Sequence, residues 1–237
     1  MNIYVRVNFR DEYHNTNMTK AVNGFREMGA YIIKYHDISE IMNKLTKEDI
    51  VIDYIHQIQS VFNHFNCNYQ LIDYPSCFIP FYGREIKEDF ISNIAENEQR
   101  WPIFMKSKKT KLFAGKVIKN IKDLRGINAY SEDLEVFYSE VIDIRSEYRI
   151  FILYDEIKMI SLYKGDYHYK YDPIVVDQII EAFKTWKDRP NGCGIDIGVT
   201  SDYKTIVVEV NDGYALGSYG TQDIMYAKIM SALLVKL

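Results

Sequence analysis

Two acids and an amide near the end of the chain have the chemistry of a metal site. Asp196 lies in the first of two predicted antiparallel strands, which turn at Ser201-Asp202, and Glu209 and Asn211 lie in the second. Because residues i and i+2 of a strand share a face, Glu209 and Asn211 project together, and Asp196 can approach from the partner strand. Such oxygen ligands suit Mg²⁺, which often also holds a substrate phosphate, so ATP use is expected. An edge hairpin with a polar solvent face is the alternative interpretation.

A run of lysines between residues 106 and 116 could neutralise nucleotide phosphates. Lys106 follows Phe104-Met105 in a predicted strand, and Lys116 follows a glycine on the predicted return strand. A lysine is a compact point charge for phosphate, so we expect Lys106 to bind phosphate, with Lys116 a weaker candidate. The other three, Lys108, Lys109 and Lys111, are expected to form a solvated turn, as most charge runs do.

The stretch from residue 139 to 149 could bind the rest of a nucleotide. A strand ending in Glu140, Val141 and Ile142 can present backbone N–H and C=O groups to an adenine edge, and Glu147 could accept ribose hydroxyls. Arg149 shares the strand face of Glu147, where it could bind a phosphate or a carboxylate in bidentate fashion. A cross-strand ion pair is the alternative for these two charged residues.

Strands and helices alternate over the first eighty residues. Short apolar runs near 3–7, 31–33, 50–52 and 70–72 are predicted strands, and helices are predicted over 19–28 and around 58–65. This alternation favours a parallel sheet of the α/β kind, which resembles a Rossmann sheet. No glycine-rich phosphate loop follows the first strand, so we do not expect this half to bind the nucleotide.

A cluster of turn residues between 74 and 83 predicts a boundary. After it, the pattern predicts a helix over 85–100, strands over 103–106 and 112–118, and a short helix near 122. Strands over 135–142, 148–154 and 157–163 and a helix over 174–186 precede the hairpin of Asp196. An amphipathic helix is predicted from 221 to 237.

Composition excludes some classes of protein. The 237 residues are 47% hydrophobic and 26% charged, with a net charge of -4, so no basic field argues for nucleic acid or a membrane surface. Three cysteines without metal spacing favour a reducing cytoplasm. We expect no signal peptide and no transmembrane helix, because polar residues interrupt the first apolar run and no run reaches about 18 residues. The five histidines form no metal motif.

In their order along the chain, these residues resemble the ATP-grasp superfamily. They comprise a strand lysine, a glycine-bearing loop, a Glu-hydrophobic-hydrophobic hinge, an acid seven positions after the hinge glutamate, and an Asp followed by Glu-x-Asn. The step of 13 residues from Asp196 to Glu209 is similar to that in D-alanine–D-alanine ligases. The resemblance is detailed from about 101 to 219. The Phe-Ala-Gly-Lys and Glu-Tyr-Arg forms look closer to a small, poorly characterised lineage of bacteria and phages.

The resemblance implies an α/β (α+β) fold with two domains. Residues 1–83 would form a Rossmann-like pre-ATP-grasp domain, and residues 84–237 an ATP-grasp domain. Two α+β subdomains would clasp ATP, a lid over about 101–142 and a metal-binding subdomain over about 143–237. The implied contacts are Lys106 and Lys116 for phosphates, Glu140, Val141 and Ile142 for adenine, Glu147 for ribose, and Asp196, Glu209 and Asn211 for Mg²⁺ or Mn²⁺.

One position departs from the ligases, which carry an arginine two residues before the metal-binding aspartate. Here that position is Gly194, so the oxyanion-stabilising role would fall to Arg149 or Lys164. The resemblance implies an ATP-dependent carboxylate–amine ligase that forms an acyl phosphate, with a small-molecule or peptide substrate, no nucleic acid or membrane partner, and an oligomer as an open option. A small-molecule kinase and a nucleotide-binding regulatory protein are the alternatives. The complete set of metal ligands favours turnover, whereas ligase and kinase chemistry are not separated.

Overall fold

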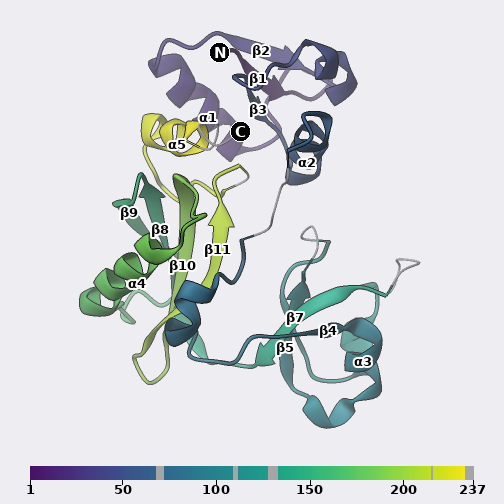
Figure 1. The fold of residues 1–237 in the computed structure, drawn as a ribbon, viewed down its shortest axis with the longest axis vertical. Helices are drawn as coiled ribbons and strands as arrows, with labels where there is room; N and C mark the ends of the chain where they lie inside the picture. Colours follow the sequence, from purple (N-terminus) through teal and green to yellow (C-terminus); the bar gives the residue numbers. More distant parts are fainter. Residues whose placement is uncertain (68–71, 109–111, 128–132, 215, 233–237) are drawn as a thin grey trace.

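Three β-sheets organise the chain (Figure 1). The computed structural model describes residues 1–67, 72–108, 112–127, 133–214 and 216–232. Within these ranges one sheet has three strands and two sheets have four strands each. The result is the mixed α/β class that the sequence predicts. No helix in the described ranges is long and apolar enough to cross a membrane.

The first sheet is parallel, as the alternation of strands and helices predicts. Its order is β2-β1-β3, with β1 at Ile3–Arg6, β2 at Ile32–Tyr35 and β3 at Ile50–Ile52. Two α-helices, α1 (Thr16–Glu27) and α2 (Ile55–His64), and two 3-10 helices, η1 (Ile38–Glu40) and η2 (Met42–Lys44), accompany it. Helix α1 starts three residues before the predicted position because Asn15 caps it, accepting from Met18 N at 3.0 Å. The predicted strand at 70–72 lies largely outside the described residues, and Ile72 is not in a strand.

The second sheet has the order β4-β7-β5-β6 with antiparallel pairing, and we call it the lid sheet. Its strands are β4 (Lys87–Phe90), β5 (Ile103–Ser107), β6 (Lys116–Ile118) and β7 (Glu135–Glu140). Its helices are α3 (Ile91–Glu96), η4 (Glu98–Arg100) and η5 (Ile121–Leu124), and α3 packs on Met105, Ile118 and Val136. The single helix predicted over 85–100 is wrong. Residues 87–90 pair with β7 instead, so tertiary pairing overrides the local pattern.

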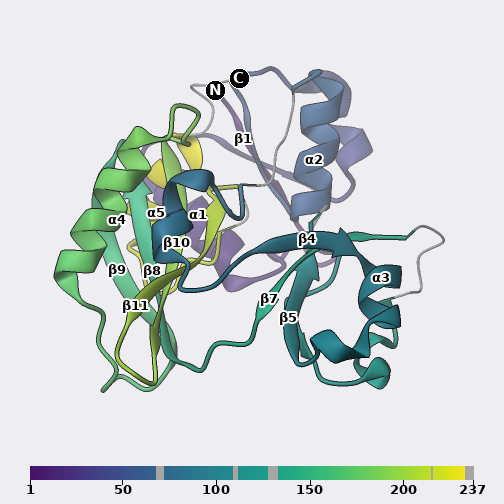
Figure 2. The ribbon, with the colours of Figure 1, turned by 60° about the horizontal axis from the view of Figure 1, so that its bottom comes forward.

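The third sheet, which we call the C-terminal sheet, has the order β11-β10-β8-β9. It comprises β8 (Ile144–Leu153), β9 (Glu156–Gly165), β10 (Gly192–Thr200) and β11 (Thr205–Asp212). Helix α4 (Pro173–Thr185) covers one face, where Val176, Ile179 and Phe183 join the core of the sheet (Figure 2). The 3-10 helix η3 (Ser76–Phe81) packs in the same core through Phe78, so the predicted boundary segment is tied to this sheet.

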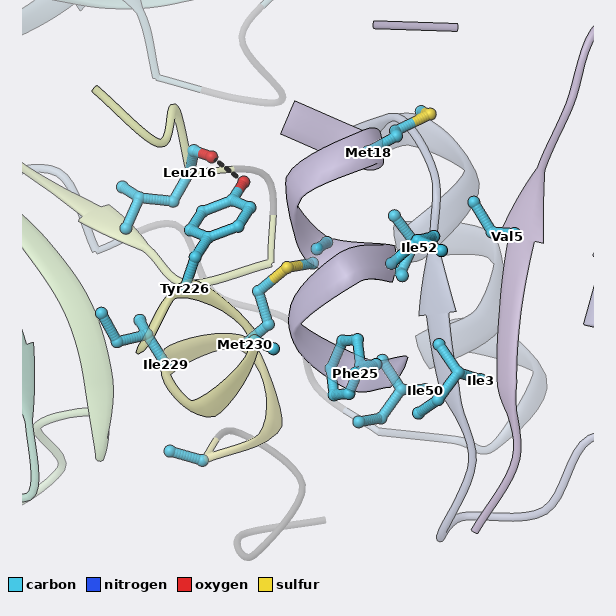
Figure 3. Packing of buried hydrophobic residues seen from close by; sticks show 14 of the residues in the cluster. Ile3, Val5, Met18, Phe25, Ile50, Ile52, Leu216, Tyr226, Ile229 and Met230 are labelled. Carbon is cyan, nitrogen blue, oxygen red and sulfur yellow. Dashed lines mark hydrogen bonds between the residues drawn. The ribbon is translucent and has the colours of Figure 1, made fainter. Parts of the chain in front are cut away.

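Helix α5 (Asp223–Ser231) joins the first sheet to the third. Figure 3 shows Met230 of α5 pointing toward α1, and Phe25 of α1 beside Ile3 and Ile50 of the first sheet. The two helices approach so closely that a Cβ on Gly24 would lie 2.0 Å from the carbonyl oxygen of Asp223. The helix starts two residues after the predicted position, and residues 233–237 lie outside the description. The shared core fixes the N-terminal unit to the C-terminal sheet.

Candidate functional site

A cavity of about 820 Å³ lies between the lid sheet and the C-terminal sheet. The six residues predicted to contact the nucleotide all line it: Lys106, Lys116, Glu140, Val141, Ile142 and Glu147. The segment that links the two sheets forms one wall, and Lys164 and Glu209 contribute from the C-terminal sheet. A cavity of this size suits a small-molecule cofactor or substrate. We call it the inter-sheet cavity.

The predicted metal-binding side chains converge beside this cavity. Strands β10 and β11 pair in antiparallel register with Asp196 opposite Glu209, so the predicted hairpin is confirmed. The side-chain N–H₂ of Asn211 donates to Asp196 Oδ2 at 3.0 Å and to Glu209 Oε1 at 3.1 Å. Asp196 is 1% exposed and Asn211 6%, so water screens this cluster little.

The chemistry of this cluster fits a hard cation. Burial raises the pKa of Asp196, while Arg149 lowers it and Glu209 raises it further, so a positive charge would stabilise the ionised pair. The amide of Asn211 carries an oxygen as well as the N–H₂ that bonds the two carboxylates. Among the described residues no three His, Cys, Asp or Glu side chains gather as a metal site. The amide, and a phosphate from a substrate, would therefore have to complete the shell of Mg²⁺.

Arg149 belongs to β8 and holds Asp196 from the side opposite Glu209. Its Nε donates to Asp196 Oδ1 at 2.7 Å and its Nη2 to Oδ2 at 2.6 Å, in a bidentate pair that is almost fully buried. The side chain passes over Gly194, where an added Cβ would lie 3.0 Å from Arg149 Cδ. An arginine from the neighbouring strand therefore occupies the space above the position where the ligases carry theirs.

Aromatic rings enclose the guanidinium of Arg149. Its Cζ lies 4.7 Å from the ring centroid of Tyr219 and 5.6 Å from that of Tyr163, and the two rings stack at 4.6 Å. Cation–π attraction adds to the bidentate pair and fixes the arginine in place. A third donor, Nη1, lies 3.4 Å from the carbonyl oxygen of Gly217, which is a long contact.

Glu147 and Lys164 are cross-strand neighbours on β8 and β9 and form an ion pair. The hydroxyl of Tyr163 also donates to Glu147 Oε2 at 2.8 Å. The side chain of Lys164 is 69% exposed, in contrast to the 6% of Arg149. The alternative interpretation, cross-strand ion pairing, is thus present at both Glu147 and Arg149, and both predicted catalytic cations have an acidic partner.

Lys106 is the buried cation of the lid sheet. Its Nζ lies between the carboxylates of Asp73 and Glu209, 2.6 Å from Glu209 Oε2. Burial alone would lower the pKa of Lys106, but Glu209, then Tyr74 and Asp73, outweigh it and raise the pKa, which keeps the ammonium charged.

The rest of the lysine run is less buried than Lys106. Lys116 is half-buried and lines the cavity from β6. Just before it, a Cβ on Gly115 would lie 2.4 Å from the Phe104 ring, so only glycine fits there. Lys108 pairs with Glu88 at the surface, and Lys109 and Lys111 lie outside the described residues.

Three residues that the sequence did not single out also shape the site. Asp73 bonds Lys106, and Tyr74 lies beneath the same ammonium, 5.2 Å from ring centroid to Nζ. Arg84 donates to the carbonyl oxygens of Val207 and Val208 at 3.2 and 2.9 Å, where a β-bulge shifts the register after Asp196. The Asp-Tyr-Pro turn was the only local signal for Asp73, and turns alone do not identify partners.

The comparisons with known proteins follow this geometry. A family model described as an ATP-grasp domain, the second family of its clade, matches residues 81–229. A search of curated proteins gives no significant match.

Solved structures share the whole fold at low sequence identity. The ATP complex of D-alanine–D-alanine ligase from Bacillus anthracis matches with a TM-score of 0.61 and 12% identity, over 99% of this chain and 96% of that one. A RimK domain ATP-grasp protein from Sphaerobacter thermophilus matches with a TM-score of 0.61 and 12% identity, over 98% and 99%. A macrocyclase from Microcystis aeruginosa bound with its precursor peptide matches with a TM-score of 0.50 and 12% identity, over 100% of both chains.

Proposed function

The chain belongs to this family of ATP-grasp domains, and from this premise we propose that it is an ATP-dependent carboxylate–amine ligase. The family and the ligases among the similar structures support the expectation of an enzyme of this type. One observation carries the proposal for the nucleotide site. All six residues predicted to contact the nucleotide line a single cavity, next to the cluster of Asp196, Glu209 and Asn211.

Each side of the cavity has its own proposed role. Lys106 and Lys116 bind the phosphates, the segment Glu140–Ile142 binds adenine, and Glu147 binds the ribose. Asp196, Glu209 and Asn211 hold Mg²⁺, or Mn²⁺ in its place, which when bound neutralises phosphate charge and polarises the transferred phosphoryl group. The side chains contribute by position and charge, because phosphoryl transfer asks for little covalent chemistry from the protein.

The reaction proceeds in two balanced steps. A substrate carboxylate oxygen attacks the γ-phosphorus of ATP, the bond to the β,γ-bridging oxygen breaks, and ADP leaves. An amine nitrogen then attacks the acyl carbon, the carbon–oxygen bond breaks, phosphate leaves, and the amine loses a proton. We assign oxyanion stabilisation to Arg149 rather than Lys164, because Arg149 is held rigidly over Gly194 whereas Lys164 is exposed.

The domain assignment is part of the same proposal. Residues 1–83 would be the Rossmann-like pre-ATP-grasp domain and residues 84–237 the ATP-grasp domain. In support, the lid sheet starts at Lys87 and the family match at residue 81. The substrate classes that we propose are a small molecule or a peptide, since the similar structures include D-alanine–D-alanine ligase and a macrocyclase bound with a precursor peptide.

A trapping assay tests the ligase chemistry. Hydroxylamine replaces the amine in reactions with Mg·ATP and a panel of amino acids and peptides, and an acyl phosphate gives a coloured hydroxamate plus ADP and phosphate. Hydroxamate from any acid, absent with Glu209→Gln, is the expected result. A phosphate ester with ADP and no hydroxamate would contradict the ligase and favour a kinase.

A further inference from the structure

Asp73 connects the segment before the family match to the buried lysine of the lid sheet. Its side chain is 4% exposed, and it lies eight residues before the matched range begins at 81. Its carboxylate accepts a hydrogen bond from Lys106, 33 positions away in sequence. Its backbone oxygen accepts from Val210 N at 2.9 Å, which fixes Asp73 to the edge of β11 between Glu209 and Asn211.

Tyr74 extends this connection to the lid sheet. Its ring lies under the Lys106 ammonium and packs edge-on against Phe137 of β7, with centroids 4.9 Å apart. The same ring contacts Tyr82 at 5.6 Å, in the core of the C-terminal sheet. The Asp73-Tyr74 pair therefore sits where the two sheets meet around Lys106.

The two acidic partners of Lys106 differ in what nucleotide binding asks of them. Glu209 belongs to the proposed metal cluster, so a bound cation competes with Lys106 for its carboxylate. Asp73 comes from the segment before η3, outside the hairpin of that cluster, and its backbone is anchored to β11. An ammonium has three N–H donors, so Lys106 can keep Asp73 and still offer a donor to phosphate.

We propose that Asp73 is a positioning residue that holds the Lys106 ammonium in place for the nucleotide phosphates when Glu209 engages the metal. The inference rests on the proposed function of the inter-sheet cavity. It adds a residue outside the matched ATP-grasp range to the phosphate site. The role is exerted through Lys106 alone, without contact between Asp73 and the nucleotide.

Binding of Mg·ATP and of adenosine by calorimetry tests this role. Asp73→Asn should raise the Kd for Mg·ATP about tenfold, the cost of a charge-assisted hydrogen bond at the lower end of its range. The Kd for adenosine, which has no phosphates, should change less than twofold. The matched control is Asp49→Asn, a buried carboxylate that bonds Asn2 and Thr46 away from the cavity. That control should lower the melting temperature and leave both Kd values unchanged.

Three outcomes would overturn the role of Asp73. The first is an unchanged Kd for Mg·ATP, and the second is a lower Kd, since Asp73 would then compete with phosphate. The third is an equal loss for adenosine. Failure of the wild type to bind Mg·ATP would instead overturn the proposed function itself.

A second comparison covers the case in which Asp73→Asn does not fold. Lys106→Met and Lys106→Met/Asp73→Asn remove one or both charges of the buried pair, and the double variant leaves neither charge unpaired. The two should bind Mg·ATP with equal Kd if Asp73 acts only through Lys106. A further loss of at least threefold in the double variant would contradict the proposal.

Discussion

The β10–β11 hairpin and the β5–β6 hairpin both present charged side chains to the inter-sheet cavity, but they assemble their sites differently. In the first, Asp196 and Glu209 face each other directly in register within one hairpin. In the second, Lys106 finds its partners 33 and 103 positions away, in two other parts of the chain. A site within one hairpin depends on local register, whereas a site between sheets depends on the whole fold.

The largest expected effect concerns the β10–β11 hairpin. Glu209→Gln keeps the size of the side chain but removes the charge that Mg²⁺ prefers, so turnover should fall at least about 100-fold. The variant should remain folded, and Mn²⁺ should restore part of the activity because it binds less charged shells better. ADP production with a confirmed substrate pair measures the effect.

The control for this prediction is Glu156→Gln, an exposed glutamate at the start of β9. It should retain wild-type turnover. Near-normal ATP consumption by Glu209→Gln would remove Glu209 from the metal site and return β10–β11 to an ordinary polar hairpin. Asn211→Ala should act in the same direction as Glu209→Gln, because it removes the amide between the two carboxylates.

The next effect concerns the β5–β6 hairpin. Lys106→Ala should raise the Kd for Mg·ATP roughly 10- to 150-fold, since a hydrogen bond to a charged group contributes about 1.5–3 kcal/mol. Lys108→Ala, two residues further along but paired with Glu88 at the surface, should change it less than about twofold. Calorimetric titration of both variants gives the ratio. Equal losses would mean that the basic run acts only as a diffuse charge.

Burial separates the two arginines of β8 in the same way. Arg149→Ala leaves Asp196 buried without its bidentate partner and should lower the free energy of unfolding by about 3–5 kcal/mol. Arg145→Ala breaks an exposed pair with Asp143 and should cost less than about 1 kcal/mol. Urea denaturation of both variants measures the difference. Similar losses would show that the Arg149 pair contributes no more than a surface pair.

The smallest effect is expected at Lys164. Its pair with Glu147 leaves the ammonium largely exposed, so Lys164→Ala should change the free energy of unfolding by at most about 0.5 kcal/mol. With Arg149 as the oxyanion-stabilising residue, turnover should fall less than about threefold. A loss comparable to that of Arg149→Ala in steady-state assays would transfer the role to Lys164.

Local sequence patterns predicted the β10–β11 hairpin because its signals are contiguous. Alternation and the Ser201-Asp202 turn place Asp196, Glu209 and Asn211 on one face, and the bulge after Asp196 leaves their register intact. The parallel first sheet was predicted for the same reason, since its strands alternate with amphipathic helices. The order of residues along the chain also indicated the family that the match to residues 81–229 confirms.

Long-range partners set the limits of the sequence analysis. Residues 87–90, Lys-Glu-Asp-Phe, carry no strand alternation and become β4 only by pairing with β7. Asp73, Tyr74 and Arg84 have no local feature that names Lys106 or the carbonyls of Val207 and Val208 as their partners. The arginine over Gly194 comes from another strand, so only pairing of β8 with β10 reveals it.

Mg·ATP binding by the wild-type protein tests the central claim, that the inter-sheet cavity is a nucleotide site, most directly. A ligand at a hundredfold excess over Kd stabilises the native state by about 2.7 kcal/mol. For a chain of this size that corresponds to a rise of about 5–11 °C in melting temperature. The expected result is this rise with Mg·ATP and a smaller rise with ATP in excess EDTA. A melting temperature unchanged by millimolar Mg·ATP, with no heat of binding in calorimetry, would contradict the claim.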